Sequence, residues 1–396
     1  MPNESSRREG YLVLADISGY TAFLTGTELE HAQGIIEELT TLIHDRLVPP
    51  LHFVKLEGDA VFCYADGFEF NDGERLLEVL EVCYCDFADR LFDMARSSTC
   101  GCAACAAIDT LDLKFVAHFG TYMVQQLAGV QDLAGPDVIL LHRLLKNSIT
   151  EGTGCRAYAF FTEPCLQRLP ASLNLPKHAE TYESFGETTG GVHDLKPVLA
   201  EMRQERREYI SAADADIEST FEVPVPPPVL WQYWVDPDKS VRWLTKADPF
   251  VAKGRETTSD LVFGHRNAPN SRGRLGVGAI AHCEHGASDM LHRYVDWRPF
   301  KYFTRELAPI KRSFFRPPMT ETAEFVPRDD GGTVCHYRIR FQNRGRLFQL
   351  GVRLLAPVLR RQFRGFEANL RRLGEEEELL AQYAVETPTE GDKAQR

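Results

Sequence analysis

The sequence lacks a long uninterrupted apolar run. Its most apolar stretches, at 138–145 and 347–359, are broken by Arg143 and Arg353. Both are shorter than the roughly 20 apolar residues that a membrane-spanning helix needs, so we expect no transmembrane segment. The start of the chain, at 1–10, is polar and charged and has no apolar core of a secretory signal. We therefore expect a cytoplasmic protein.

An excess of positive charge is also missing. The chain has 45 Lys and Arg against 57 Asp and Glu, a net charge of −12. An acidic chain is a poor partner for a phosphate backbone, so we expect no nucleic-acid partner. With 43% hydrophobic and 26% charged residues, the composition excludes a disordered or fibrous protein. A length of 396 residues predicts two or three domains.

Cysteine is too sparse for a disulfide scaffold, and we interpret the ten cysteines as reduced thiols. Cys100, Cys102 and Cys105 lie close enough in sequence to hold a zinc ion tetrahedrally. Cys83 and Cys85 are two residues apart on a predicted helix and point in different directions, so at most one of them could join the site. The alternatives are small thiols that fill a core, or a redox role.

Apolar patterns divide the chain into two halves. The first half reads β-α-β-β-α-β-β-α-β, which predicts an α+β domain of the split βαβ kind. A charged helix at 196–210 follows. The second half predicts an antiparallel sheet capped by one long helix at 345–373, and a frayed acidic tail. The expected organisation is a first domain at 10–195, a helical linker at 196–211, a second domain at 212–374 and a tail at 375–396.

Two aspartates stand out in the first half. Asp16 ends the first predicted strand, and Asp59 lies in a predicted hairpin turn. If the strands are neighbours, the two carboxylates repel each other unless a cation lies between them. Such hard oxygen ligands suit Mg²⁺ or Mn²⁺ bound to a nucleoside triphosphate. The alternative is an ordinary turn residue and an ordinary strand-end cap.

The segments around these aspartates, ADISGYT at 15–21 and KLEGDAV at 55–61, resemble the two metal-site motifs of class III nucleotidyl cyclases. The resemblance covers roughly 10–195 and implies a ferredoxin-like, cyclase-type fold. It also implies roles for individual residues: Asp16, Asp59 and the backbone carbonyl of Ile17 bind the metal, Lys55 and Asp132 read adenine, and Arg143 stabilises the transition state. Because that family shares each site between two domains, one such domain per chain implies a homodimer.

The sequence departs from the family at Ile139, where active cyclases have asparagine. Losing one transition-state donor typically costs about 10²–10³ in rate. Lys146 is the nearest candidate for a second phosphate-binding lysine. Three hypotheses stay open: an adenylate cyclase that converts ATP to cyclic AMP and pyrophosphate, a nucleotide sensor or adaptor without turnover, and a scaffold.

The second half resembles the START-like helix-grip fold of the SRPBCC superfamily over about 212–374. This resemblance implies a cavity for a lipid or another hydrophobic small molecule, and a role in signalling coupled to the first domain. Eight aromatic residues could line such a cavity or simply fill the core: Trp243, Phe250, Phe263, Tyr294, Trp297, Phe303, Phe314 and Phe315.

Overall fold

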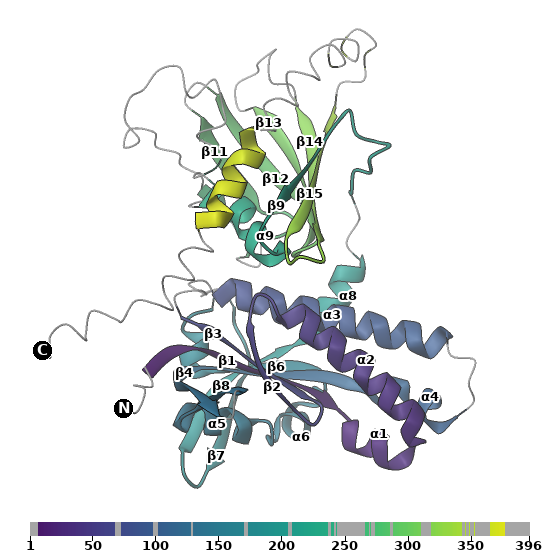
Figure 1. The fold of residues 1–396 in the computed structure, drawn as a ribbon, viewed down its shortest axis with the longest axis vertical. Coiled ribbons are helices and arrows are strands. Elements are labelled where there is room, and N and C mark those ends of the chain that lie inside the picture. The colour runs from purple at the N-terminus through teal and green to yellow at the C-terminus, as the bar shows by residue number, and fades with distance from the viewer. Residues whose placement is uncertain are drawn as a thin grey trace, which may run out of the picture. The chain divides into compact units, whose positions relative to one another are not determined.

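The structure is a computed structural model, in which the chain divides into two units, Met1–Glu205 and Arg206–Arg396 (Figure 1). Among the residues that it describes, no helix is long and apolar enough to cross a membrane. The described residues are 7–67, 73–97, 102–127, 130–169, 173–204, 208–236, 239–240, 243, 266–268, 270, 274–285, 288–309, 318–342, 345, 348, 352 and 365–376.

The first unit is built on an eight-stranded sheet of order β2-β3-β1-β4-β6-β8-β7, with β5 paired to β4. Strand β1 lies antiparallel between β3 and β4, and β4 pairs in parallel with β6. The strands are β1 (Arg7–Ser18), β2 (His52–Glu57), β3 (Ala60–Asp66), β4 (Asp112–Leu127), β5 (Val130–Ala134), β6 (Tyr158–Thr162), β7 (Lys177–Tyr182) and β8 (Gly186–Asp194).

Helices cover both faces of this sheet. Helices α2 and α3 run side by side along one face, and α5 lies on the other (Figure 1). Side chains along β1 point alternately to the two faces of the sheet. Leu12 and Leu14 point to the face that α5 covers, and they share a core cluster with that helix. The helices are α1 (Tyr20–Gly26), α2 (Leu29–Leu47), α3 (Gly73–Ser97), α4 (Ala103–Ala106), α5 (Pro136–Leu144), α6 (Ile149–Thr153), α7 (Glu163–Leu166) and α8 (Leu195–Gln204), with a 3₁₀ turn at Ile108–Thr110.

The predicted α+β class is confirmed, with three differences in detail. In the predicted order, the two strands before the third helix correspond to 113–119 and 122–127, on either side of Gly120, and they form one strand, β4. A Cβ at Gly120 would lie 2.6 Å from both His118 Nε2 and Asp137 Oδ2, so any other residue there would have to displace these two side chains. The hairpin of β7 and β8 was not predicted. The charged helix expected in the linker is α8, which packs on α3 through Arg203 and Asp89.

The second unit contains a seven-stranded antiparallel sheet of order β10-β11-β12-β13-β14-β15-β9. Helix α9 (Pro227–Val235) and a helix at 365–376 contribute to its core. The rest of the predicted helix at 345–373 lies almost entirely outside the described residues, as does the tail from 377. The strands are β9 (Ile217–Val223), β10 (Arg266–Ala268), β11 (Ile280–His285), β12 (Ser288–Arg298), β13 (Tyr302–Pro309), β14 (Met319–Pro327) and β15 (Thr333–Phe341).

Aromatic side chains fill the described core of the second unit. The Trp231 ring lies 4.8 Å from the Trp297 ring and 5.7 Å from the Phe303 ring, in edge-to-face geometry. Trp234 lies 4.7 Å from Trp243. These rings pack against one another, and so most of the described aromatics serve as core. Phe250, Phe263, Phe314 and Phe315 lie outside the described residues.

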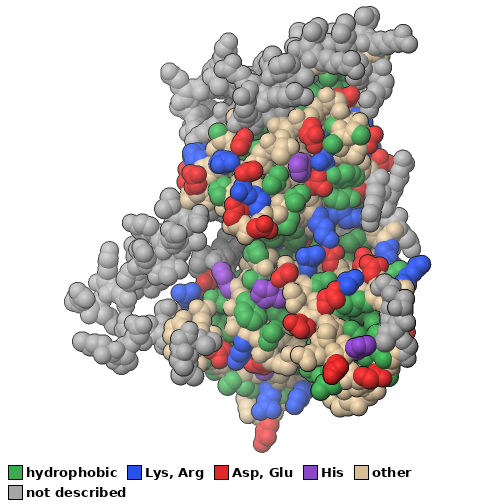
Figure 2. All heavy atoms as spheres, turned by 45° about the vertical axis from the view of Figure 1, so that its right-hand side comes forward, with side chains coloured by type: hydrophobic (Ala, Val, Ile, Leu, Met, Phe, Trp, Pro, Cys, Tyr) green, Lys and Arg blue, Asp and Glu red, His purple; other side chains and the backbone are tan. Residues whose placement is uncertain are grey.

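The surface drawn in Figure 2 carries charges of both signs. Acidic and basic side chains lie among one another on each unit, with hydrophobic atoms between them (Figure 2). This face of the described chain therefore offers no extended patch of a single sign.

Candidate functional site

The first predicted metal ligand, Asp16, lies near the end of β1 on the face that α5 covers. Its side chain points to the same face of the sheet as Leu12 and Leu14. The Asp16 carboxylate therefore lies at the margin of the core that these leucines share with α5. Asp16 is paired in register with Lys114 of β4, and Lys114 Nζ lies 3.1 Å from Asp16 Oδ2. The two side chains are partly buried, so this contact is a shielded ion pair.

The second predicted ligand, Asp59, lies in the turn between β2 and β3. Gly58 precedes it with a φ of 68°, in the left-handed region that favours glycine. Asp59 Oδ2 accepts a hydrogen bond of 3.1 Å from the backbone N–H of Ile17, the residue after Asp16. The pKa of Asp59 is raised to about 6, mainly by burial and to a lesser extent by the neighbouring charge of Asp16. The structure thus brings the two carboxylates together, as expected from the motifs.

Lys114 is a site residue that the sequence interpretation missed. Besides its pair with Asp16, Lys114 Nζ donates to the backbone carbonyl of Leu145, at the C-terminal end of α5. The available signal was a single lysine among the apolar residues at 113–117, and the β1–β4 register places it directly opposite Asp16. Lys114 links the carboxylates to the helix that carries Arg143.

The predicted purine-reading pair is also assembled. Lys55 Nζ on β2 lies 3.1 Å from Asp132 Oδ2 on β5 and 3.1 Å from Glu57 Oε1. Partial burial lowers the pKa of Lys55, but the hydrogen bonds to Asp132 and Glu57 outweigh this effect and raise it. Glu57 Oε2 lies 3.0 Å from Nδ1 of His142 on α5, and burial lowers the pKa of that histidine. Glu57 and His142 were not among the predicted site residues.

The remaining predicted residues lie on α5 or just after it and face solvent. Ile139 is 53% exposed, and Arg143 and Lys146 are also exposed. Ile139 and Arg143 are four residues apart, so they lie on the same face of α5. This face is therefore available to a ligand or to a second chain.

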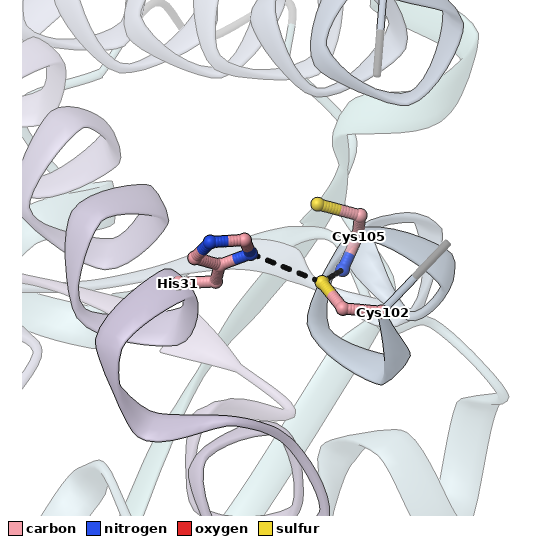
Figure 3. A group of neighbouring side chains, drawn as sticks. All are labelled: His31, Cys102 and Cys105. Atoms are coloured by element: carbon pink, nitrogen blue, oxygen red, sulfur yellow. Dashed lines mark hydrogen bonds between the residues drawn. The ribbon is translucent and has the colours of Figure 1, made fainter. Parts of the chain in front are cut away.

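The predicted cysteine site differs from the structure in its composition. Cys102 and Cys105 lie together, but their neighbour is His31 of α2, and Cys100 is outside the described residues (Figure 3). Cys83 and Cys85 are buried in α3 and take no part in this group, and burial raises the pKa of both thiols. Sequence spacing could not predict His31, which is 71 residues from Cys102.

Comparison with known proteins gives relatives without an established activity. A family described as protein of unknown function (DUF2652) matches residues 35–153. The uncharacterized protein Rv2561/Rv2562 of Mycobacterium tuberculosis (strain ATCC 25618 / H37Rv) is 33% identical over 156 residues, which is 37% of this chain. The chain spans 66% of the length of that relative.

Several solved structures show a weaker likeness. A bacterial light-regulated adenylyl cyclase is 14% identical, with a TM-score of 0.36 over 51% of this chain and 58% of that one. The adenylyl cyclase CyaB from P. aeruginosa is 14% identical, with a TM-score of 0.34 over 48% and 97%. A class III adenylyl cyclase-like ATP-binding protein from Pseudomonas aeruginosa is 16% identical, with a TM-score of 0.32 over 42% and 36%. At such low TM-scores, what the site can do has to follow from its own residues.

Proposed function

We propose that the first unit binds a purine nucleoside triphosphate together with Mg²⁺ or Mn²⁺. The observation that carries this proposal is that the β2–β3 hairpin contributes one residue to each of two polar contacts, one at the carboxylates and one at the lysine. Asp59, at the tip, bonds to the backbone beside Asp16, while Lys55, earlier in β2, bonds to Asp132. The partners in these bonds are 42 and 77 residues apart in sequence, so only the fold brings them together.

The carboxylates fit a hard divalent cation. Asp16 contacts Lys114 through Oδ2, and Asp59 accepts from the Ile17 N–H through Oδ2. A carboxylate has two oxygens and about four lone-pair sites, so each group can bind a metal as well. The backbone carbonyl of Ile17 would add a third oxygen ligand, and oxygen ligands are those that Mg²⁺ and Mn²⁺ prefer. A bound ion would relieve the repulsion between the two carboxylates and neutralise phosphate charge.

The pair of Lys55 and Asp132 fits adenine. Lys55 supplies a donor and Asp132 an acceptor, which match a ring nitrogen and the exocyclic amino group of that base. Both side chains are about one-third exposed, so a base can reach them. Asp132 Oδ1 accepts a hydrogen bond of 2.8 Å from the backbone N–H of Leu133, and this contact holds the carboxylate in place while Oδ2 meets the base.

Cyclisation of ATP is a second candidate, favoured by the exposed Arg143. In this reaction the 3′-hydroxyl of ATP attacks the α-phosphate, and pyrophosphate leaves. A guanidinium near the α-phosphate stabilises the charge that develops there. Ile139, on the same face of α5, offers no hydrogen bond where the cyclase motif has asparagine, so we expect slow turnover. The carboxylates and the α5 face would come from different chains of a homodimer.

For the second unit we propose a helix-grip fold that binds a hydrophobic small molecule or lipid, with signalling to the first unit. The indole N–H groups of Trp231 and Trp234 support this proposal. Both are buried, and neither has a hydrogen-bond acceptor among the described residues. A ligand with an acceptor atom would satisfy them. Native mass spectrometry of protein purified from cells should reveal a co-purifying small molecule, and its absence would contradict this proposal.

An assay of nucleotide preference tests the first unit. Equilibrium dialysis of labelled ATP against the full-length chain with Mn²⁺ should show binding that unlabelled ATP displaces more strongly than GTP. Asp16→Ala should lose this binding. In the same samples, cyclic AMP above the level of Asp16→Ala would establish turnover. Equal retention of ATP by wild type and Asp16→Ala would contradict the proposed site.

A further inference from the structure

The second group of polar side chains in the first unit is formed by His31, Cys102 and Cys105. His31 is in the first turn of α2, Cys102 immediately precedes α4, and Cys105 belongs to α4 (Figure 3). One ligand atom from each residue lies within 4.8 Å of the other two. The cluster contains no residue of the carboxylate site, and its chemistry differs from that of the site.

The distances fit a tetrahedral zinc ion. With Zn–S about 2.3 Å and Zn–N about 2.0–2.1 Å, tetrahedral angles place a sulfur and a nitrogen ligand about 3.6 Å apart and two sulfurs about 3.8 Å apart. His31 Nδ1 lies 3.2 Å from Cys102 Sγ. All three ligand atoms lie within 4.8 Å of one another. Shifts of these atoms by about 1 Å or less would bring them to the separations of a tetrahedral zinc site.

Surrounding hydrogen bonds hold the ligands in this arrangement. The carboxylate of Glu28, just before α2, accepts hydrogen bonds from the backbone N–H groups of Ala103 and Ala104, at 3.3 and 3.1 Å. These bonds fix α4 against the start of α2. The backbone N–H of Cys105 donates to Cys102 Sγ at 3.4 Å, which favours the thiolate that binds metal. Such outer contacts orient the ligands before an ion arrives.

The ligand types and their exposure select the class of ion. Two thiolates and an imidazole favour zinc over Mg²⁺ or Ca²⁺, which prefer oxygen. Cys102 and Cys105 are partly exposed, so an ion can reach them. By contrast, Cys63, Cys83, Cys85, Cys165 and Cys335 are buried, and burial raises the pKa of each of these thiols.

We propose that His31, Cys102 and Cys105 bind a zinc ion that ties α4 to α2. Three protein ligands leave the fourth position to a water molecule or another donor. The proposal is independent of nucleotide binding, because it involves other residues and another class of ion. It assigns a stabilising role to the segment that carries α4, a helix of four residues.

The test uses the full-length chain kept under reducing conditions, equilibrated with Zn²⁺ and dialysed. We expect about one zinc per chain for wild type and little for Cys105→Ser or His31→Ala. Cys155→Ser and His44→Ala are matched controls, because Cys155 is partly exposed and His44 lies on the same helix as His31. Both should bind zinc like wild type.

Two further measurements keep the result independent of variant folding. Co²⁺ added to metal-free wild type should give a thiolate-to-cobalt charge-transfer band, which oxygen ligands cannot produce. Zinc at about 100 times its Kd should raise the Tm of wild type by roughly 5–10 °C and leave that of Cys105→Ser unchanged. Equal zinc content in Cys105→Ser and Cys155→Ser would overturn the proposal, as would a Cys102–Cys105 disulfide that persists under the reducing conditions of the test.

Discussion

At the scale of single residues, the first unit keeps two carboxylates close together at a cost in stability. The raised pKa of Asp59 means that, between about pH 4 and 6, the folded chain holds a proton that the unfolded chain has lost. Stability therefore falls as the pH rises through this window. The proposed metal site accounts for such a pair, because a bound cation would reverse this penalty.

We predict that Asp59→Asn stabilises the metal-free protein at neutral pH. The asparagine carbonyl can still accept the hydrogen bond from Ile17, but it carries no charge next to Asp16. In EDTA at about pH 7.5, the variant should be more stable than wild type by about 1–2 kcal/mol, after allowance for solvent screening. At about pH 4 the difference should disappear. Urea unfolding at both pH values measures this, and an equal difference at both would contradict the assigned pKa.

A second prediction at this scale concerns Ile139. Replacing it with asparagine restores a donor on the exposed face of α5, beside Arg143. We expect Ile139→Asn to raise the rate of cyclic AMP formation by up to about 10²–10³ with ATP and Mn²⁺. Ile139→Leu is the control, since it changes shape without adding a donor. If the two variants show the same rate, the missing donor does not limit turnover.

At the scale of secondary-structure elements, strands β13, β14 and β15 share a buried ionic cluster. Arg305, Glu321 and Tyr337 are all buried, and Glu321 accepts hydrogen bonds from both partners. Burial tends to lower the pKa of Arg305, but the charge of Glu321 outweighs that effect and raises it. The cluster therefore fixes the register of three strands through one carboxylate.

We predict that Glu321→Ala destabilises the second unit by about 3–5 kcal/mol, because it leaves the Arg305 guanidinium buried without its carboxylate. The matched control is Glu306→Ala, which removes the more exposed pair with Arg293 and should cost about 0–1 kcal/mol. Tryptophan fluorescence during urea unfolding reports this unit specifically, since all four tryptophans lie in it. Equal costs for the two variants would contradict the role of the cluster.

Elements with a strong apolar pattern could be predicted from the sequence, and those held by polar or distant contacts could not. Buried β1 and the turn at Gly58 were evident, and with them Asp16 and Asp59. The hairpin of β7 and β8 was missed because its strands are partly exposed and rich in threonine and glutamate. Lys114 and His31 were missed because register and helix packing, which spacing does not encode, bring them to their partners.

At the scale of the whole molecule, the proposed homodimer makes each nucleotide site depend on two chains. Asp16 and Asp59 would come from one chain, and Lys55, Asp132 and Arg143 from the other. The exposed face of α5 is consistent with this division, because Ile139 and Arg143 are open to a partner.

Mixing two defective chains tests this division. We expect Asp16→Ala and Lys55→Ala homodimers each to bind no ATP with Mn²⁺. After mixing and exchange of subunits, half of the dimers contain one of each chain, and each of these has one intact site. About a quarter of the wild-type binding capacity should return. No recovery, despite exchange shown by native mass spectrometry, would mean that each chain forms its own site.

The most direct measurement of the central claim is calorimetric titration of ATP into the full-length chain, with Mn²⁺ and with EDTA. We predict binding only with Mn²⁺, loss of that binding in Asp16→Ala and in Lys55→Ala, and wild-type binding in Asp45→Ala, which changes an exposed aspartate of α2. Binding of equal strength in EDTA, or binding unaffected by Asp16→Ala, would contradict a metal-dependent nucleotide site at the tip of the β2–β3 hairpin.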